Sequence, residues 1–191
     1  MRHLRVYHSF RSPYSRLGLH VLWRAGIEPE LVPFTGPPEG SEFLDAMNSP
    51  AKMAYVRQDV VRMTKLMKLE LKIPENLAID FGPSYRASVA ASLAGRGMAF
   101  ALSVYEARWA RGLNIADLGV LSDCAMEAGL PADFAEKMQS EAAVKQEMRR
   151  HRELIEQDQA FGVPLAVAGK QKYWGHERIE LMLKLEQLAV A

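Results

Sequence analysis

The first 34 residues carry the signals of a strand, a helix and a second strand in that order. Leu4–Ser9 alternates apolar and polar residues, as a half-buried strand does. Ser12 is a favourable helix N-cap, Pro13 suits the first helical position, and Gly26 ends the apolar helical pattern. Ile27–Phe34 follows as a second strand. These signals predict a βαβ unit, whose two strands are parallel and joined by a right-handed crossover.

The middle of the chain has a different character, because apolar residues recur there at helical spacing. After the glycine- and proline-rich loop 36–40, the pattern stays helical from Ser41 to about Gln159. The expected helices are Asp59–Leu71, Ser84–Arg111, Ile115–Ala128 and Pro131–Ile155.

The end of the chain returns to mixed structure. Phe161–Val167 and Gln171–Trp174 are expected to form paired strands around a turn, and His176–Leu188 a terminal helix. The chain is therefore expected to fold as an α/β protein in two parts. Residues 1–36 and 160–191 form one discontinuous domain, and residues 37–159 form an inserted helical domain.

Composition excludes several classes of function. The net charge of +1 gives no electrostatic footprint for nucleic acid. The single cysteine, Cys124, allows no intrachain disulfide and fits a reducing compartment. No signal peptide or membrane-spanning run is recognised, so a cytoplasmic protein without a membrane partner is expected. The five histidines show no metal-ligand spacing, so no metal site is predicted.

Three separated motifs indicate a family. The first is S-P-Y-S at residues 12–15, and the second is N-x-P-x-K-x-x-Y-x-x-x-D at residues 48–59. The third is F-G-V-P at residues 161–164, with W-G-H-E-R about ten residues later at 174–178. In this order and spacing the chain resembles the 2-hydroxychromene-2-carboxylate isomerases and kappa-class glutathione transferases. The resemblance implies a thioredoxin-like fold, related to the DsbA-type disulfide oxidases, with a large all-helical insertion between the βαβ and ββα halves.

Ser12 has two interpretations. As an N-cap it would accept a hydrogen bond from the first turn of the helix. The resemblance implies a second role, in which Ser12 replaces a cysteine of the oxidases and stabilises the thiolate of glutathione. The unpaired N–H groups and the macrodipole of a helix N-terminus favour an anion there. Ser15 is interpreted as a first-turn hydroxyl that bonds the backbone.

The resemblance also assigns the rest of the glutathione site. It implies a cis peptide bond before Pro164, with the backbone of Val163 pairing with the cysteinyl part of the ligand. It places the γ-glutamyl end at the start of the last helix, where this chain has His176 and Glu177. Asn48 and Lys52 begin the inserted domain, and Lys52 suits a carboxylate of glutathione or of the substrate.

Several side chains remain open between two roles. Arg16 is either a contact for an anionic substrate or an exposed helical arginine. Trp109 either packs or lines a hydrophobic substrate pocket, and Trp174 is interpreted as packing. Tyr55 and Asp59 are interpreted as helix packing and a surface acid.

The leading hypothesis is a glutathione-dependent isomerase that acts on an aromatic or keto-acid intermediate of ring degradation. A kappa-class-like glutathione transferase acting on electrophiles, and a non-catalytic thioredoxin-fold binding protein, are the alternatives. A disulfide oxidoreductase is disfavoured because both cysteine positions of the motif are serines. The small-residue helix and the many methionines leave room for a homodimer interface.

Overall fold

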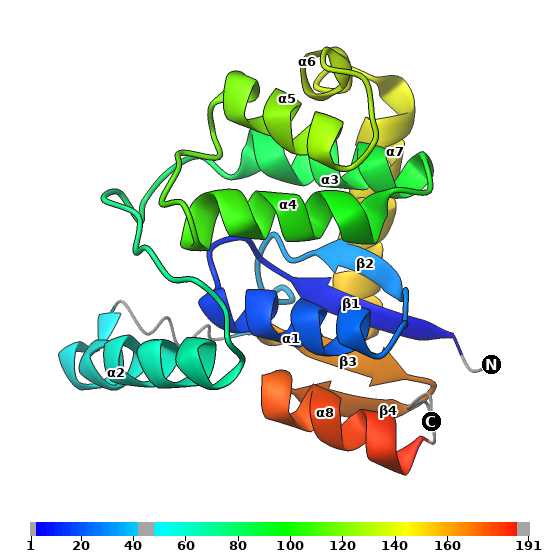
Figure 1. Ribbon diagram of the computed structural model, residues 1–191. Helices are drawn as coiled ribbons and strands as arrows, with labels where there is room; N and C mark the ends of the chain where they lie inside the picture. Colours follow the sequence, from blue (N-terminus) through cyan, green and yellow to red (C-terminus); the bar gives the residue numbers. More distant parts are fainter. Residues whose placement is uncertain (1–2, 42–47, 187–191) are drawn as a thin grey trace.

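A mixed four-stranded sheet forms the centre of the protein, in a computed structural model that describes residues 3–41 and 48–186. The strand order is β2-β1-β3-β4 (Figure 1). β1 (Leu4–His8) runs parallel to β2 (Glu30–Pro33) and antiparallel to β3 (Leu165–Ala168), which pairs with the antiparallel β4 (Gln171–Trp174). The predicted βαβ unit and the closing ββα unit are both present.

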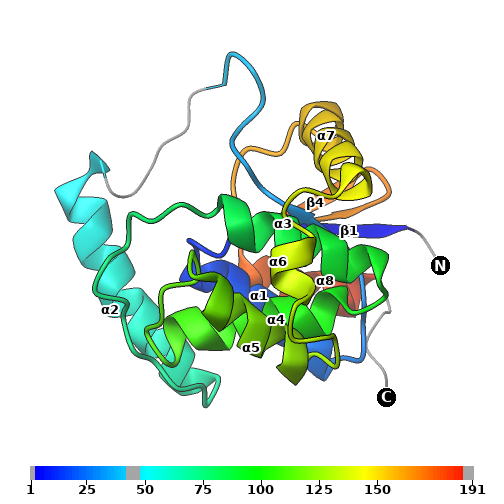
Figure 2. The same ribbon diagram turned by 90° about the horizontal axis from the view of Figure 1, so that it is seen from above.

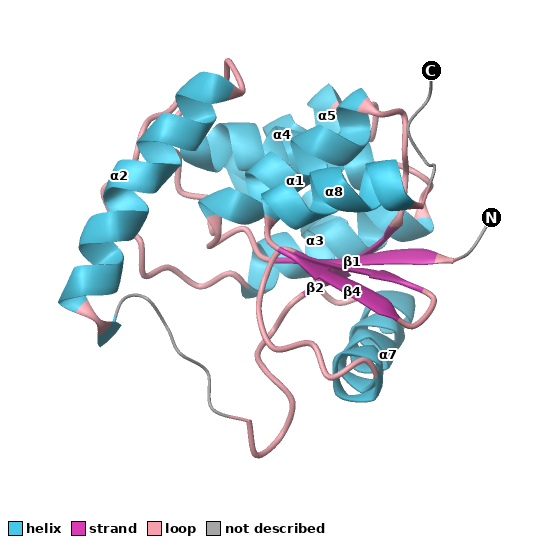
Figure 3. Cartoon of the chain, turned by 90° about the horizontal axis from the view of Figure 1, so that it is seen from below, coloured by secondary structure: helices cyan, strands magenta, loops and turns pink. Residues whose placement is uncertain are grey.

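Helices cover the two faces of the sheet unequally. α1 (Pro13–Arg24) and α8 (His176–Leu185) lie on one face, and α7 (Ala142–Gln157) lies on the other (Figure 3). Four more helices extend the first layer: α3 (Gly82–Leu93), α4 (Gly97–Trp109), α5 (Leu118–Glu127) and α6 (Phe134–Lys137). None of the helices in the described ranges is long and apolar enough to cross a lipid bilayer.

α2 (Pro50–Leu66) stands apart from these layers. Figures 1 and 2 both place it beside the molecule, next to the start of α1, and on neither face of the sheet. Its buried residues are few, namely Asp59, Val60 and Thr64. α2 is therefore attached to the body along a narrow stripe.

Alternation along β1 divides the core between the two faces. Val6 belongs to the large hydrophobic cluster beneath α1 and α4, whereas Tyr7 belongs to the cluster under α7. The Tyr7 hydroxyl also donates to the carbonyl of Leu154 on α7 at 2.9 Å. Alternate residues of β1 thus pack against helices on opposite faces of the sheet.

The predicted helix boundaries in the insertion are partly wrong. The expected helix Ser84–Arg111 is two helices, because Gly95 between α3 and α4 takes a left-handed φ of 71°. The expected helix Pro131–Ile155 is divided into α6 and α7. The expected helix Asp59–Leu71 begins nine residues earlier, at Pro50, because Ser49 caps it, and ends at Leu66.

A buried ion pair connects the first helix to the insertion. Arg16 on α1 is 1% exposed, and its Nε and Nη2 donate to the two carboxylate oxygens of Glu106 on α4 at 2.9 and 2.7 Å. Its Nη1 donates to the carbonyl of Glu70 at 2.7 Å. Both roles considered for Arg16 are wrong, since it is neither exposed nor free to meet a substrate.

Breaking this pair from the Glu106 side should be costly. In Glu106→Leu the buried guanidinium keeps only the Glu70 carbonyl, so we expect a loss of about 3 kcal/mol in the free energy of unfolding. Urea denaturation measures this loss. The matched control is Arg111→Leu, which breaks the exposed pair with Glu127 and should cost less than about 1 kcal/mol. Equal losses in the two variants would contradict the assignment.

A second ion-pair cluster joins β1, β2 and α7 at the sheet edge. The Glu30 carboxylate accepts from Arg5 Nε at 2.7 Å, from His3 Nε2 at 2.6 Å and from Arg150. Burial alone would raise the pKa of Glu30, but the hydrogen bonds from Arg150, His3 and Arg5 outweigh it and lower the pKa to about 2.

The cluster predicts an acid-sensitive part of the stability. Because the pKa of Glu30 falls from 4.5 to about 2 on folding, its stabilisation is present above pH 4.5 and is lost as the pH drops toward 2. Glu30→Gln should therefore show a smaller loss of stability than wild type over that interval, measured by urea unfolding at successive pH values. Glu28→Gln, an exposed neighbour, should keep the wild-type profile.

Candidate functional site

Ser12 caps α1 as its sequence context predicts. Its backbone is extended, with φ −97° and ψ 114°, and its Oγ accepts a hydrogen bond from the N–H of Ser15 at 3.2 Å. Ser12 is half-buried, so its hydroxyl is shielded from solvent without being enclosed. The cap uses the hydroxyl only as an acceptor, and its proton stays available for donation.

The first turn of α1 also offers a backbone donor. The N–H of Tyr14 has no hydrogen-bond acceptor among the described residues, and Pro13 has no N–H to offer. The free N–H and the Ser12 O–H lie at the positive end of the helix dipole. This turn can therefore bind an anion. Interpreting S-P-Y-S as a helix cap alone does not account for this capacity.

A close approach at Gly18 holds α1 against the third motif. A Cβ at Gly18 on α1 would lie 3.2–3.3 Å from the ring of Pro164 and 3.0 Å from Ile179 of α8, so glycine allows the contact. The Val163–Pro164 peptide bond is cis, as the resemblance implied. The S-P-Y-S helix, the cis peptide and the last helix therefore meet at one place.

The backbone at Val163 is free to pair with an extended ligand. Neither its N–H nor its C=O has a hydrogen-bond partner in residues 3–41 and 48–186, whereas the next carbonyl, that of Pro164, accepts from Gly175 N at 2.9 Å. The backbone is thus paired at Pro164 and unpaired at Val163. An extended peptide can add to a strand by bonding to such unpaired backbone groups.

The start of α8 places His176 and Glu177 differently from each other. The His176 ring is only 3% exposed and stacks on Tyr14, with centroids 5.7 Å apart and planes 14° apart. Burial lowers the pKa of His176, and the nearby carboxylates of Glu177, Asp59 and Glu180 partly offset that effect. Glu177 is about half exposed, with Oε2 at 3.1 Å from His176 Nδ1. The Glu177 carboxylate is thus accessible from solvent, whereas the His176 ring is not.

Asn48 and Lys52 are both exposed at the start of α2. Among the described residues, neither side chain makes a hydrogen bond or ion pair. Their predicted role in binding glutathione therefore depends on how α2 is held.

Tyr14 and Asp59 form a contact that the sequence interpretation missed. The Tyr14 hydroxyl donates to Asp59 Oδ2 at 2.8 Å, and Arg62 donates to the other oxygen at 2.8 Å. Asp59 is 7% exposed, so its interpretation as a surface acid is wrong. Tyr55, interpreted as packing, is 57% exposed. The available signal was the spacing of Lys52 and Asp59, which puts both on one face of a helix.

Buried polar contacts fix the loop that leads into Ser12. Trp109 Nε1 donates to the Phe10 carbonyl at 3.0 Å, and the Ser9 and Tyr85 hydroxyls lie 2.6 Å apart. Ser15 Oγ accepts from Ser9 N at 3.3 Å, as its interpretation as a backbone-bonding hydroxyl predicted. Trp109 is 5% exposed and packs, so it lines no open substrate pocket.

An exposed aromatic pair flanks the cis peptide. Phe161 and Trp174 are 46% and 57% exposed, with ring centroids 5.3 Å apart in an edge-to-face arrangement. The indole also faces Gly162, where a Cβ would lie 3.0 Å from Nε1. Trp174 therefore packs, as interpreted, but at the surface against Phe161 and Gly162.

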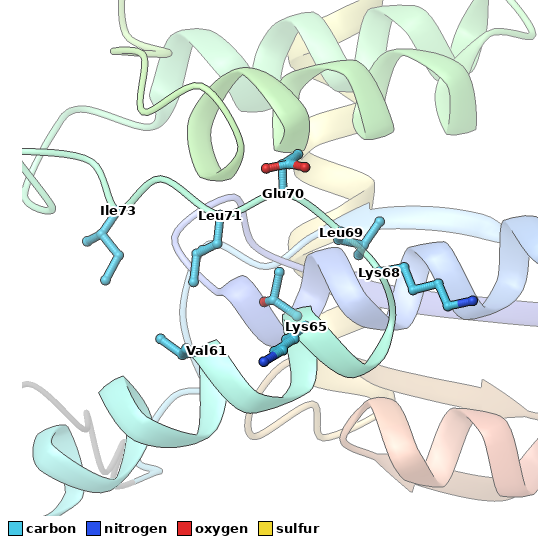
Figure 4. A pocket seen from close by; sticks show the side chains of 8 residues that line it. Val61, Lys65, Lys68, Leu69, Glu70, Leu71 and Ile73 are labelled. Atoms are coloured by element: carbon cyan, nitrogen blue, oxygen red, sulfur yellow. The ribbon is translucent and has the colours of Figure 1, made fainter.

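A groove of about 580 Å³ lies between α2 and the segment that follows it, and Figure 4 shows the side chains that line it. None of the predicted site residues lines it; its lining is Val61, Thr64, Lys65, Lys68, Leu69, Glu70, Leu71 and Ile73. Another group, Glu30, Glu147 and His151, has metal-ligand spacing. The carboxylates of that group are already hydrogen-bonded to Arg5 and Arg150, which compete with a cation.

Comparison with known proteins agrees with this architecture. A curated 2-hydroxychromene-2-carboxylate isomerase from Sphingobium xenophagum is 28% identical over 134 residues, which are 65% of this chain and 69% of the relative. A solved structure of 2-hydroxychromene-2-carboxylate isomerase superposes with a TM-score of 0.80 at 17% identity, covering 96% of this chain and 94% of the other.

A cytosolic disulfide reductase, DsbM from Pseudomonas aeruginosa, solved with GSH, superposes with a TM-score of 0.66 at 18% identity. The match covers 96% of this chain and 98% of the reductase. The matched proteins thus include an isomerase and a reductase, and they confirm the predicted thioredoxin-like α/β fold. The family model described as a DSBA-like thioredoxin domain matches residues 3–185. The chain therefore belongs to the DsbA-like thioredoxin domain family.

Proposed function

We propose that the protein is a glutathione-dependent isomerase that acts on a small aromatic or keto-acid substrate. The observation that carries the proposal is the first turn of α1, where the Ser12 hydroxyl proton and the Tyr14 N–H are both free, on a helix that packs against Pro164 of the cis Val163–Pro164 peptide. The isomerase relative supports this reaction class, and the reductase solved with GSH supports this ligand class.

The residues present fit a thiol-bearing peptide. The unpaired backbone of Val163 would pair with its cysteinyl unit, and the start of α8 with Glu177 would hold its α-amino acid end. Pro164 fixes the turn that presents Val163. His176 packs behind Tyr14, and Asn48 and Lys52 would face the other end of the peptide.

Ser12 is the catalytic residue of the proposal. Its hydroxyl would donate to sulfur and, with the helix dipole and the Tyr14 N–H, favour the thiolate over the thiol. When bound, glutathione would supply a thiolate for reversible addition to an unsaturated carbon; this would permit rotation about the former double bond, and the thiol would be released unchanged. The protein's own role is to hold that negative charge and to orient both partners.

Disulfide exchange is not proposed, because the chain lacks the sulfur for it. Residues 12 and 15 are serines, and Cys124 is enclosed in α5, where burial raises the pKa of its thiol. A buried thiol with a raised pKa is a poor nucleophile. Cytoplasmic location and a homodimer remain predictions from the sequence.

Ser12→Ala tests the assignment of the catalytic residue. We expect the variant to bind glutathione within about threefold of wild type, because the Val163 and α8 contacts remain. The pKa of the bound thiol should return close to its value in free glutathione, since the donor to sulfur is gone. Calorimetry measures the affinity, and the ultraviolet absorbance of the thiolate measures the pKa.

Two further variants separate thiolate stabilisation from helix capping. Ser12→Gly keeps most of the cap, because glycine is tolerated there, yet removes the hydroxyl, so it should behave as Ser12→Ala does. The Asp117 side chain caps α5 by accepting from Gly119 N at 2.7 Å. Asp117→Ala removes this cap and should leave the thiol pKa unchanged. An unshifted thiol pKa in both Ser12 variants would refute the role of Ser12.

Net consumption of glutathione distinguishes the isomerase from the alternatives. An isomerase should convert a cis-configured unsaturated aryl keto acid at a rate that depends on glutathione, while the thiol concentration stays constant. Loss of free thiol, with a chloronitrobenzene-type electrophile forming a conjugate, would instead identify a kappa-class-like transferase. Absence of glutathione binding by calorimetry would favour a non-catalytic binding protein.

A further inference from the structure

Tyr14 connects three helices: α1, to which it belongs, α2 and α8. It is the second residue of α1, and its ring and its hydroxyl contact two different helices. The ring stacks on His176 of α8, and the hydroxyl reaches Asp59 of α2.

The contact to α2 matters because that helix buries only Asp59, Val60 and Thr64. Among the described residues, side chains of α1 hold α2 at two points: Tyr14 donates to Asp59 within the helix, and Arg24 Nη2 donates to the carbonyl of Met67, where α2 ends, at 2.8 Å. Both partners are well shielded, since Asp59 is 7% exposed and Tyr14 is half-buried. Burial and the Asp59 carboxylate both raise the pKa of Tyr14, so the phenol stays a donor across the physiological range.

The same bond determines which face of α2 is turned toward α1. Lys52 precedes Asp59 by seven residues, which is two helical turns and about 10 Å along the axis, on nearly the same face. Fixing Asp59 against Tyr14 therefore fixes the direction of the Lys52 face. If the bond is lost, α2 can rotate or move away while α1 and α8 stay in contact through Gly18, Pro164 and Ile179.

We infer that Tyr14 is a positioning residue that holds the two ends of the ligand site in register, through its hydroxyl for the α2 end and through its ring for the α8 end. The inference rests on the proposed function, because it takes the ligand to be a peptide thiol that spans from α8 to α2. The Tyr14 side chain does not act on the sulfur itself, because its hydroxyl is hydrogen-bonded to Asp59.

Fragments of glutathione separate the two contacts. Tyr14→Phe keeps the ring on His176 and removes the bond to Asp59. It should weaken cysteinylglycine, which carries the carboxylate for Lys52, by about tenfold, and leave γ-glutamylcysteine within about twofold. Tyr14→Leu removes both contacts and should weaken both dipeptides. Calorimetric affinities relative to wild type measure these changes.

Variants at the acceptor provide the matched controls. Asp59→Asn keeps an acceptor for the Tyr14 hydroxyl and should retain most of the cysteinylglycine affinity, whereas Asp59→Leu should reproduce Tyr14→Phe. Arg62→Ala removes the other partner of Asp59 and should leave the fragment pattern unchanged. Equal weakening of both dipeptides in Tyr14→Phe, or of neither, would overturn the inference.

Hydrogen exchange tests the contact without any ligand. Tyr14→Phe should speed exchange of the α2 amides and leave those of α8 at wild-type rates, and unchanged α2 exchange would overturn the positioning role. If wild type binds neither glutathione nor the dipeptides, the proposed function fails. In that case the hydrogen-exchange rates of the α2 amides alone test whether Tyr14 holds α2.

Discussion

The close contact of α1 with Pro164 and Ile179 is the constraint on which the site depends. Because Gly18 has no side chain, the helix lies directly against the turn that presents Val163 and against the last helix. A helix end that would otherwise face solvent is thereby placed beside unpaired backbone and a half-exposed carboxylate. The close packing that Gly18 permits thus determines where on the molecule the helix N-terminus could hold an anion.

The fold was largely predictable because its signals are local or periodic. Alternation in Leu4–Ser9, the Ser-Pro helix start and the closing hairpin specify the α/β order. The helix boundaries within the insertion were not predictable, because small residues there give little periodicity. Gly95 also interrupts the helical pattern without a proline to mark the break. Helix ends set by one glycine or one cap are hard to place from composition alone.

The site was predictable only where motifs supplied it. Ser49-Pro50 starts α2 with the same two residues as Ser12-Pro13, and its hydroxyl accepts from Lys52 N in the same way. Only the surroundings differ: Ser12 starts a helix that packs against Pro164 and Ile179, whereas Ser49 starts a peripheral helix. The burial of Arg16 and the contact of Tyr14 with Asp59 escaped prediction for the same reason, because each depends on residues 45 to 90 positions away.

The absence of cysteine from residues 12 and 15 has a chemical consequence beyond catalysis. A dithiol relative can be inactivated when its own sulfurs are oxidised, and it must then be reduced before it works again. Here the single cysteine is buried in α5, and residues 12 and 15 carry hydroxyl groups. Peroxide therefore has no thiol to oxidise in the first turn of α1.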